Sequence, residues 1–200
     1  MAHTGGLDGA AFLAARTLLT QRQNISAKRL VAPGPSDTEL EALLHLAAAA
    51  PDHGQLTPWR FVTVPVAQRE RLATVFAEAL VDRDAGATAA QIQAARDKAH
   101  RAPLLLVAIV CLGPREPSIP APERLVSLGA AIQNLLLGAH ALGYGSGLTS
   151  GQAMASPRMQ ALLGLTATDQ PVCCINIGTV EDDKPAPRVR PAPSVFAGTL

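Results

Sequence analysis

Hydrophobic and polar positions follow two periods along the chain, and these periods predict a succession of helices and strands. Helical spacing of apolar side chains predicts helices over about residues 10–21, 36–50, 72–80, 88–101 and 122–142, with a short one near 157–163. Alternating or short β-branched runs predict strands over residues 59–64, 104–112 and 172–178. This order predicts an α+β fold, a mixed sheet flanked by helices with one long central helix.

Local signals mark where several of these helices begin and end. Ser36 with Glu39, and Thr88 with Gln91, have the spacing of a capping box, in which each side chain caps the other residue's backbone N–H. Gly143 is a natural stop for the longest helix. The glycine-rich segment that follows, from 143 to 151, is expected to be a turn or loop leading into a strand.

No repeat or linker divides the chain, so we expect one domain over residues 1–200, with an extended Pro-rich C-terminal arm from about residue 181. The 17 Lys and Arg residues against 16 Asp and Glu give no electrostatic reason to bind nucleic acid or an anionic membrane. The N-terminus lacks the features of a secretory signal, which favours a cytoplasmic protein. Among the scarce aromatic residues, Phe12, Phe61 and Phe76 are expected in the core.

Three cysteines, Cys111, Cys173 and Cys174, are an odd number without metal-type spacing, and we interpret them as buried strand residues in a reducing compartment. The histidines also lack metal-type pairs, and no metal site is expected. A serine hydrolase is disfavoured, because Tyr144 and Leu148 stand where a nucleophile elbow around Ser146 requires glycine.

Two segments remain candidates for binding. The run from Gly143 to Gly147 suits either a phosphate cradle or a flexible turn, and the residues do not decide between them. Arg22, Gln23 and Asn24 place a cation beside two amides at the end of a helix. That combination suits a phosphate and a polyol, although a surface cation explains Arg22 as well.

Taken in order, these segments resemble the nitroreductase family, and more closely its compact bacterial subfamily of FMN-dependent NAD(P)H nitroreductases. The similarity runs from about Ala14 to Thr179. It is carried by Ala50-Pro51-Asp52-His53, Pro58-Trp59-Arg60-Phe61, Gly143-Tyr144-Gly145 and the terminal Ile177-Gly178-Thr179.

The resemblance implies a nitroreductase-like fold and a homodimer with FMN at the subunit interface. It assigns Arg22, Gln23 and Asn24 to the FMN phosphate and ribityl chain. The other implied FMN contacts are Ala49, His53, Leu148, Thr149 and Ser150. An NAD(P) segment is implied at Gly138, Ala139, His140, Ala141, Leu142 and Gly143. No side chain is assigned as catalytic, because the flavin carries the redox chemistry.

The chain departs from the family pattern at its proposed phosphate site. Gln23 and Asn24 stand where the family has arginine and serine, and arginines that close relatives have at Ala49 and Thr149 are absent. Lost cations weaken the hold on a phosphate. Lys28, Arg29, Arg188 and Arg190 are candidate replacements.

Two functions therefore stay open. One is an oxidoreductase that passes hydride from NAD(P)H through FMN to a nitro, quinone or similar electron-poor small molecule. The other is a flavin-binding member of the family with a weakened FMN site and no reductase turnover.

Overall fold

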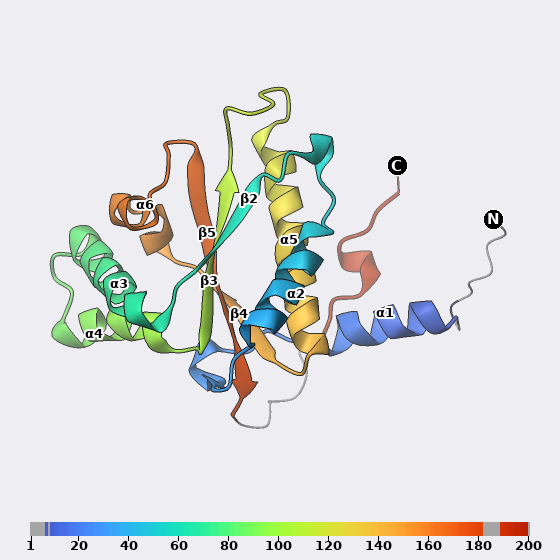
Figure 1. Cartoon of the computed structure of the whole chain (residues 1–200), viewed down its shortest axis with the longest axis horizontal. Coiled ribbons are helices and arrows are strands. Elements are labelled where there is room, and N and C mark those ends of the chain that lie inside the picture. Colours follow the sequence, from blue (N-terminus) through green and yellow to red (C-terminus); the bar gives the residue numbers. More distant parts are fainter. Residues whose placement is uncertain (1–6, 8, 182–188, 200) are drawn as a thin grey trace.

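Within the residues that the computed structural model describes, which are 7, 9–181 and 189–199, a five-stranded sheet separates two groups of helices (Figure 1). The sheet has the order β1-β5-β3-β2, and β4 pairs with β5. β5 therefore contacts β1, β3 and β4 and is the centre of the sheet. The strands are β1 (Leu30–Val31), β2 (Trp59–Thr63), β3 (Leu104–Cys111), β4 (Gly145–Thr149) and β5 (Asp169–Val180).

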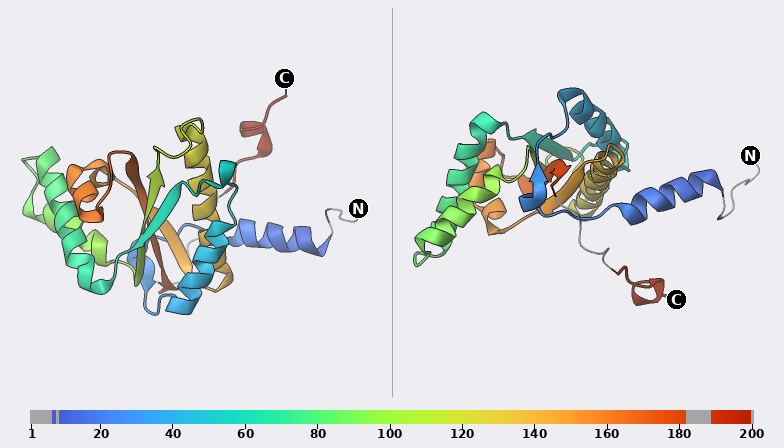
Figure 2. Two further views of the ribbon diagram at one scale, coloured as in Figure 1. Left: turned by 45° about the horizontal axis from the view of Figure 1, so that its top comes forward. Right: turned by 90° about the horizontal axis from the view of Figure 1, so that it is seen from below.

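The helices fall on the two faces of this sheet, and one stands apart. α2 and α5 cover one face, while α3, α4 and α6 cover the other (Figures 1 and 2). The helices are α1 (Ala10–Gln21), α2 (Asp37–Ala48), α3 (Arg69–Arg83), α4 (Ala89–Asp97), α5 (Ala121–Ala141) and α6 (Pro157–Leu163). None of the twelve residues of α1, all of which the structure describes, is buried.

The strand β3 explains why the core has two halves. Its even-numbered residues, such as Leu106 and Ala108, pack into the cluster under α2 and α5. Its odd-numbered residues, such as Leu105 and Val107, pack into the cluster under α3, α4 and α6. A strand buried on both faces needs apolar side chains at every position, which accounts for the unbroken apolar run seen in the sequence.

α2 and α5 run in opposite directions and lie close together. A Cβ atom at Gly138 would lie 2.5 Å from Leu46 Cδ1 and 2.8 Å from Leu43 Cδ2, so a larger residue there would require these leucine side chains to shift. The amide of Asn134 donates to the carbonyl of Leu46 at 3.1 Å. At one end of the pair the Tyr144 hydroxyl donates to Glu39 at 3.1 Å.

The α+β class and the predicted helices and strands are confirmed, including both capping boxes. The strand ladders that the structure describes are antiparallel, and the parallel part of the expected mixed sheet is an isolated bridge between Asn24 and Ser146. The segment after Gly143 was expected to contain a turn or loop, and residues 145–149 instead form β4. The short strand β1 was not foreseen.

One expected core residue is exposed: Phe12 on α1 is 45% exposed. Leu125 and Leu142, apolar residues at the two ends of the long helical segment, are 45% and 46% exposed. The described residues leave about half of each of these side chains uncovered. The sequence pattern finds apolar faces without revealing what covers them.

The three cysteines are strand residues as expected, but Cys111, the last residue of β3, is only partly buried because the sheet ends there. Cys173 and Cys174 on β5 are buried, and burial raises the pKa of Cys173 to about 11 and that of Cys174 to about 12. Thiols with such a raised pKa are poor nucleophiles at neutral pH.

The start of the expected C-terminal arm, with Arg188, lies outside the described residues, so the single-domain boundaries stay a prediction. Among the helices that the structure describes, none is long and apolar enough to span a bilayer.

The buried Arg69 connects α3 to the entry of β3. Its side chain is 3% exposed. The guanidinium donates to the carbonyls of Val64 at 2.7 Å, Ala99 at 2.6 Å, Ala102 at 3.2 Å and Pro103 at 3.1 Å. One side chain thus satisfies the backbone carbonyls of two connections.

We expect Arg69→Met to lower the free energy of unfolding by about 2–4 kcal/mol, because buried carbonyls lose their donors. Urea unfolding followed by Trp59 fluorescence measures the change. The control is Arg71→Met on the same helix, where an exposed arginine donates only to the Gln68 side chain, and a change within about 0.5 kcal/mol is expected. Equal losses in the two variants would contradict this role of Arg69.

Candidate functional site

The segment of residues 22–24 lies along β4, which joins two of the predicted binding segments. The Ile25 N–H donates to the carbonyl of Ser146 at 2.8 Å, and the Leu148 N–H donates to the side chain of Asn24 at 3.0 Å. Asn24 also forms the parallel bridge with Ser146. The structure therefore brings Arg22, Gln23 and Asn24 together with the segment of Leu148, Thr149 and Ser150.

Glycines in β4 make this contact possible. A Cβ atom at Gly147 would lie 2.1 Å from the carbonyl oxygen of Ile25, and one at Gly145 would lie 2.5 Å from Val180 Cγ2. No side chain fits either space. The two glycines are thus required by the close approach of neighbouring backbone and side chains, which explains the sequence of this segment better than a flexible turn.

A pocket of about 280 Å³, here called the arginine pocket, opens beside the start of β4. It contains four predicted site residues, Arg22, Gln23, His140 and Gly143. Its other lining residues are Gln21, Ile25, Tyr144, Gly145, Ser146 and Val180.

Two buried polar atoms of lining residues lack a partner. Neither Nε of Arg22 nor Oγ of Ser146 forms a hydrogen bond with any described residue. Ser146 is only 2% exposed. Buried polar groups are rarely left unpaired, so these two atoms point to a polar ligand in the arginine pocket.

A second arginine lies beside the first. Nη2 of Arg190 donates to the backbone carbonyl of Arg22 at 2.9 Å. Burial, and to a lesser extent the charge of Arg190, lowers the pKa of Arg22. Two neighbouring cations of this kind are stabilised by an anion. Among the other candidate cations, Lys28 lines a separate hollow with Arg101.

The far end of β4 opens into a larger hollow of about 490 Å³, here called the α3–α4 cavity. Thr149 and Ser150 line it, and their hydroxyl groups are already bonded to Asn176 Nδ2 at 3.0 Å and to the Val172 carbonyl at 2.9 Å. What these two residues offer a ligand is therefore mainly their backbone. The remaining walls are Phe76, Leu80, Arg83, Gln91, Ala94, Ala95, Lys98, Leu105, Gly151, Gln152, Ala153, Met154 and Cys174.

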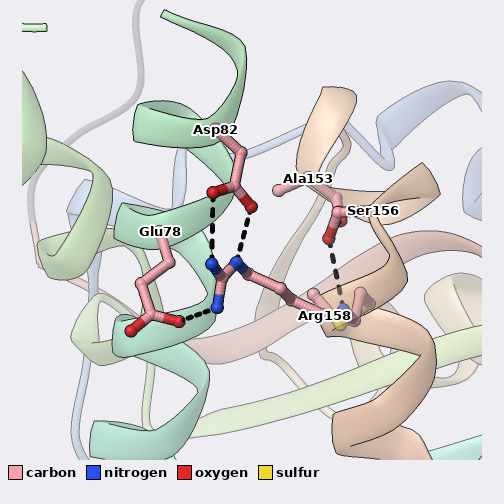
Figure 3. Close-up of polar contacts among 6 residues, drawn as sticks. Glu78, Asp82, Ala153, Ser156 and Arg158 are labelled. Atoms are coloured by element: carbon pink, nitrogen blue, oxygen red, sulfur yellow. Dashed lines mark hydrogen bonds and ion pairs between the residues drawn. The ribbon is translucent and has the colours of Figure 1, made fainter. Parts of the chain in front are cut away.

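Arg158 on α6 connects this helix to α3, one wall of the α3–α4 cavity (Figure 3). Its guanidinium donates to Asp82 at 2.6 and 3.1 Å and to Glu78 at 2.5 Å, both on α3. Just before Arg158, the Ser156 hydroxyl donates to the Ala153 carbonyl at 2.8 Å. These contacts connect the segment after β4 to α3. They fix the distance between these two parts of the chain, both of which line the α3–α4 cavity.

Ala49 and His53 lie elsewhere. Both follow α2, and His53 contacts Glu123 in the first turn of α5. The arginine pocket lies past the last turn of α5, and a helix of 21 residues is about 30 Å long. One chain therefore keeps His53 away from Arg22, and Figure 1 shows the two ends of α5 well separated. Ala49 comes one turn after Leu46, which packs against Gly138, and it is not among the residues that line the arginine pocket.

The predicted NAD(P) segment has two parts with different surroundings. Gly138 and Ala139 are buried, Gly138 against α2, and present no surface to a nucleotide. Ala141, Leu142 and Gly143 are exposed, and His140 is half-buried. Contact with a dinucleotide is limited to this second part.

Sequence reasoning included Ser146 in a candidate phosphate cradle without assigning it a contact, and it missed the contribution of α3 and α4. Phe76, Arg83 and Lys98 are more than fifty residues from Thr149 along the chain, and no local motif connects them. That the buried hydroxyl of Ser146 lacks a hydrogen-bond partner can be recognised only from the folded structure.

Comparisons with known proteins agree with this architecture. The family model described as "Nitroreductase family" matches residues 22–179. A Haemophilus influenzae protein named "Putative NAD(P)H nitroreductase" is 32% identical over 165 residues, which are 82% of this chain and 88% of the relative. The Escherichia coli K12 protein "Putative NAD(P)H nitroreductase YdjA" is 31% identical over 77% of this chain and 82% of its own length.

Solved structures share the fold. A nitroreductase-like family protein from Bacillus cereus has a TM-score of 0.79 at 20% identity, covering 100% of this chain and 98% of its own. The FMN-dependent nitroreductase NfnB from Mycobacterium smegmatis, solved with NADPH, has a TM-score of 0.71 at 16% identity, covering 94% and 98%. The chain belongs to the nitroreductase family, as the motifs predicted, and is an oxidoreductase of the nitroreductase type.

We expect Gly147→Ala to lower the free energy of unfolding by about 2 kcal/mol or more, since residues 24–25 must leave β4 to make room for the methyl group. Thermal unfolding measures the change. Gly151→Ala is the matched control, because it has extended backbone and nothing within 4 Å of the added atom. A Gly147→Ala protein as stable as Gly151→Ala would rule out the close approach.

Proposed function

We propose that the protein binds FMN and passes hydride from NAD(P)H through the flavin to a nitro, quinone or similar electron-poor small molecule. The main support is the arginine pocket, where Nε of Arg22 and Oγ of Ser146 form no hydrogen bond with a described residue. Relatives and fold neighbours named as NAD(P)H or FMN-dependent nitroreductases support the same activity.

The arginine pocket suits the phosphate of FMN. Arg22 and Ser146 line it and supply a cation and a hydroxyl donor, and Arg190, which donates to the carbonyl of Arg22, adds a second cation beside it. Charge-assisted hydrogen bonds of this kind are worth about 1.5–3 kcal/mol each. Arg190 thereby replaces part of the positive charge that is missing because residues 23 and 149 are Gln23 and Thr149 instead of arginines.

The α3–α4 cavity suits the flat ring of the flavin. Phe76, Leu80 and Met154 give it apolar walls, and Thr149 and Ser150 give it backbone polar groups. Ser146 and Thr149 are three residues apart on β4, about 10 Å along the strand, and residues at this spacing face opposite sides of a sheet. One elongated ligand with an anionic end and an aromatic end would therefore reach both hollows only by passing around β4.

Bound FMN would supply the hydride chemistry, and the chain supplies position and electrostatics. Arg22 and Arg190 hold the charged end of the cofactor. The apolar walls of the α3–α4 cavity exclude water from its ring. Arg83 and Lys98, the charged residues of that cavity within the described chain, favour negative charge there. We assign no acid or base side chain.

The functional unit is a homodimer in this proposal. α1 projects from the body without burying a residue, and the C-terminal segment 189–199 extends on the same side (Figures 1 and 2). Val126 on α5 is 70% exposed, and Leu46 on α2 is 47% exposed. An isolated helix of this length is marginal in water, so α1 needs a partner surface. A second copy also offers Ala49 and His53 to a cofactor that one chain holds at Arg22.

We expect the purified chain, incubated with FMN and desalted, to keep the visible absorption of a flavin. Arg22→Ala and Arg190→Ala each raise the dissociation constant for FMN about tenfold to a hundredfold, since each removes a charge-assisted hydrogen bond. Fluorescence titration measures the constants, and Arg71→Ala on α3 is the control with unchanged affinity. A wild-type chain that is colourless after incubation with excess FMN and desalting would refute the proposal.

The flavin-loaded chain separates the proposal from its alternative. NAD(P)H oxidation coupled to reduction of a quinone or nitroaromatic compound, measured at steady state, is expected for the oxidoreductase. Stable flavin binding without such turnover is the result expected for a flavin-binding member whose activity is lost.

We expect light scattering to give twice the chain mass for the wild type and a larger fraction of monomer for Val126→Glu. The reason is that a carboxylate at a buried subunit contact loses its hydration. Val66→Glu is the control, because Val66 is 80% exposed on a segment away from α1, α2 and α5. A monomeric wild type would remove the dimer from the proposal.

A further inference from the structure

His53 and Glu123 meet at the surface, between the segment after α2 and the first turn of α5. Nδ1 of His53 lies 2.5 Å from Oε2 of Glu123. The side chains are 65% and 47% exposed. A contact this exposed adds little to stability, so stability alone gives a weak reason for it.

The backbone around His53 is held in a conformation that most residues avoid. Gly54 has φ +69°, Gln55 has φ +53° and the β-branched Thr57 has φ +48°. The carboxylate of Asp52 accepts the Thr57 N–H at 2.6 Å and closes the turn. Residues with such strained backbone angles persist only where surrounding contacts hold them in place, and they are concentrated at ligand sites. The turn is an independent observation that points to a function for His53.

Glu123 is fixed on the other side. The first turn of a helix favours a carboxylate, because the backbone N–H groups there carry partial positive charge. The next residue, Arg124, is 2% exposed and donates to carbonyls of the preceding loop, at Ile119, Arg115 and Glu116. Ile119 in turn lies 3.0 Å from where a Cβ of Gly54 would be. The loop, the turn and the helix thus hold both partners in place.

The contact decides which nitrogen of His53 carries the proton. A carboxylate only accepts hydrogen bonds, so Glu123 draws the proton of a neutral imidazole to Nδ1. Nε2 forms no hydrogen bond with a described residue. It is left as an acceptor that faces away from Glu123.

We propose that Glu123 is a positioning residue that keeps the proton on Nδ1 of His53 and presents Nε2 to a hydrogen-bond donor of the flavin cofactor held against a second copy of the chain. The ribityl hydroxyls and the ring N–H of FMN are donors of the required kind. Val126, an exposed apolar residue of the proposed subunit contact, is on α5 with Glu123, and the exposed Leu46 is on α2, the helix that precedes the turn of His53. This inference rests on the proposed function, because His53 is an expected flavin contact.

The first experiment reads the tautomer of His53 by ¹⁵N NMR in the full chain without cofactor. The wild type shows the Nδ1–H form, and Glu123→Ala shifts the ring toward the Nε2–H form. The melting temperature checks that the variant is folded. A His53 signal that is the same in both proteins overturns the proposal, whatever the chain binds.

The second experiment measures FMN affinity in a double-mutant cycle. Glu123→Ala and His53→Gln each raise the dissociation constant about fivefold to tenfold, the loss of one hydrogen bond, and the double variant is no weaker than His53→Gln alone. Asp37→Ala, which removes an exposed acid from the first turn of α2, leaves the constant unchanged.

Additive losses in the cycle, or an equal loss in Asp37→Ala, overturn the positioning role and leave the proposed function intact. A wild-type chain that binds no FMN overturns the proposed function, and the NMR measurement then still decides whether Glu123 sets the tautomer of His53.

Discussion

The site depends on the approach of the Ile25 carbonyl to the backbone of Gly147. A Cβ atom at residue 147 would come within 2.1 Å of that oxygen, so the segment from Arg22 to Ile25 lies beside β4 only because residue 147 has no side chain. The approach brings Arg22 and Ser146 to one pocket and links Asn24 to Leu148. A cation from the end of α1 and a buried hydroxyl from β4 thereby face the same space.

α5 separates the site into two parts. Its last turn adjoins the arginine pocket, and its first turn holds Glu123 and, through it, His53. Because α2 runs antiparallel to α5, the turn that follows α2 and carries His53 lies at the start of α5, away from Arg22. A second copy is therefore the natural source of the groups that one chain keeps at a distance, and the exposed apolar residues of α1 and α5 provide a surface for it.

The distribution of cations differs from the family pattern without leaving the site neutral. The chain lacks arginines at Ala49 and Thr149, whereas Arg190 from the C-terminal segment reaches the carbonyl of Arg22. Arg83 and Lys98 line the cavity at the other end of β4. Positive charge comes from segments distant in sequence, which is why counting residues within one motif understates it.

By itself, the sequence determined the elements and the family. The boundaries of α2 and α4 were predictable because a capping box is formed by residues three apart, and β3 was predictable because burial on both faces requires an unbroken apolar run. The motifs around His53, Trp59 and Gly143 were sufficient to identify the family that the comparisons confirm. These signals come from residues close together in the chain, so they can be read from the sequence without the fold.

The tertiary structure alone decided what the elements bring together. β4 was read as a loop because its glycines lack strand propensity, and their purpose depends on Ile25 and Val180 lying against them. Phe12 was expected in the core because an apolar face does not reveal whether it packs within one chain or against another. The arginine pocket, the α3–α4 cavity and the pairing of His53 with Glu123, which are 70 positions apart, join residues from distant parts of the chain, and such contacts exist only after the chain has folded.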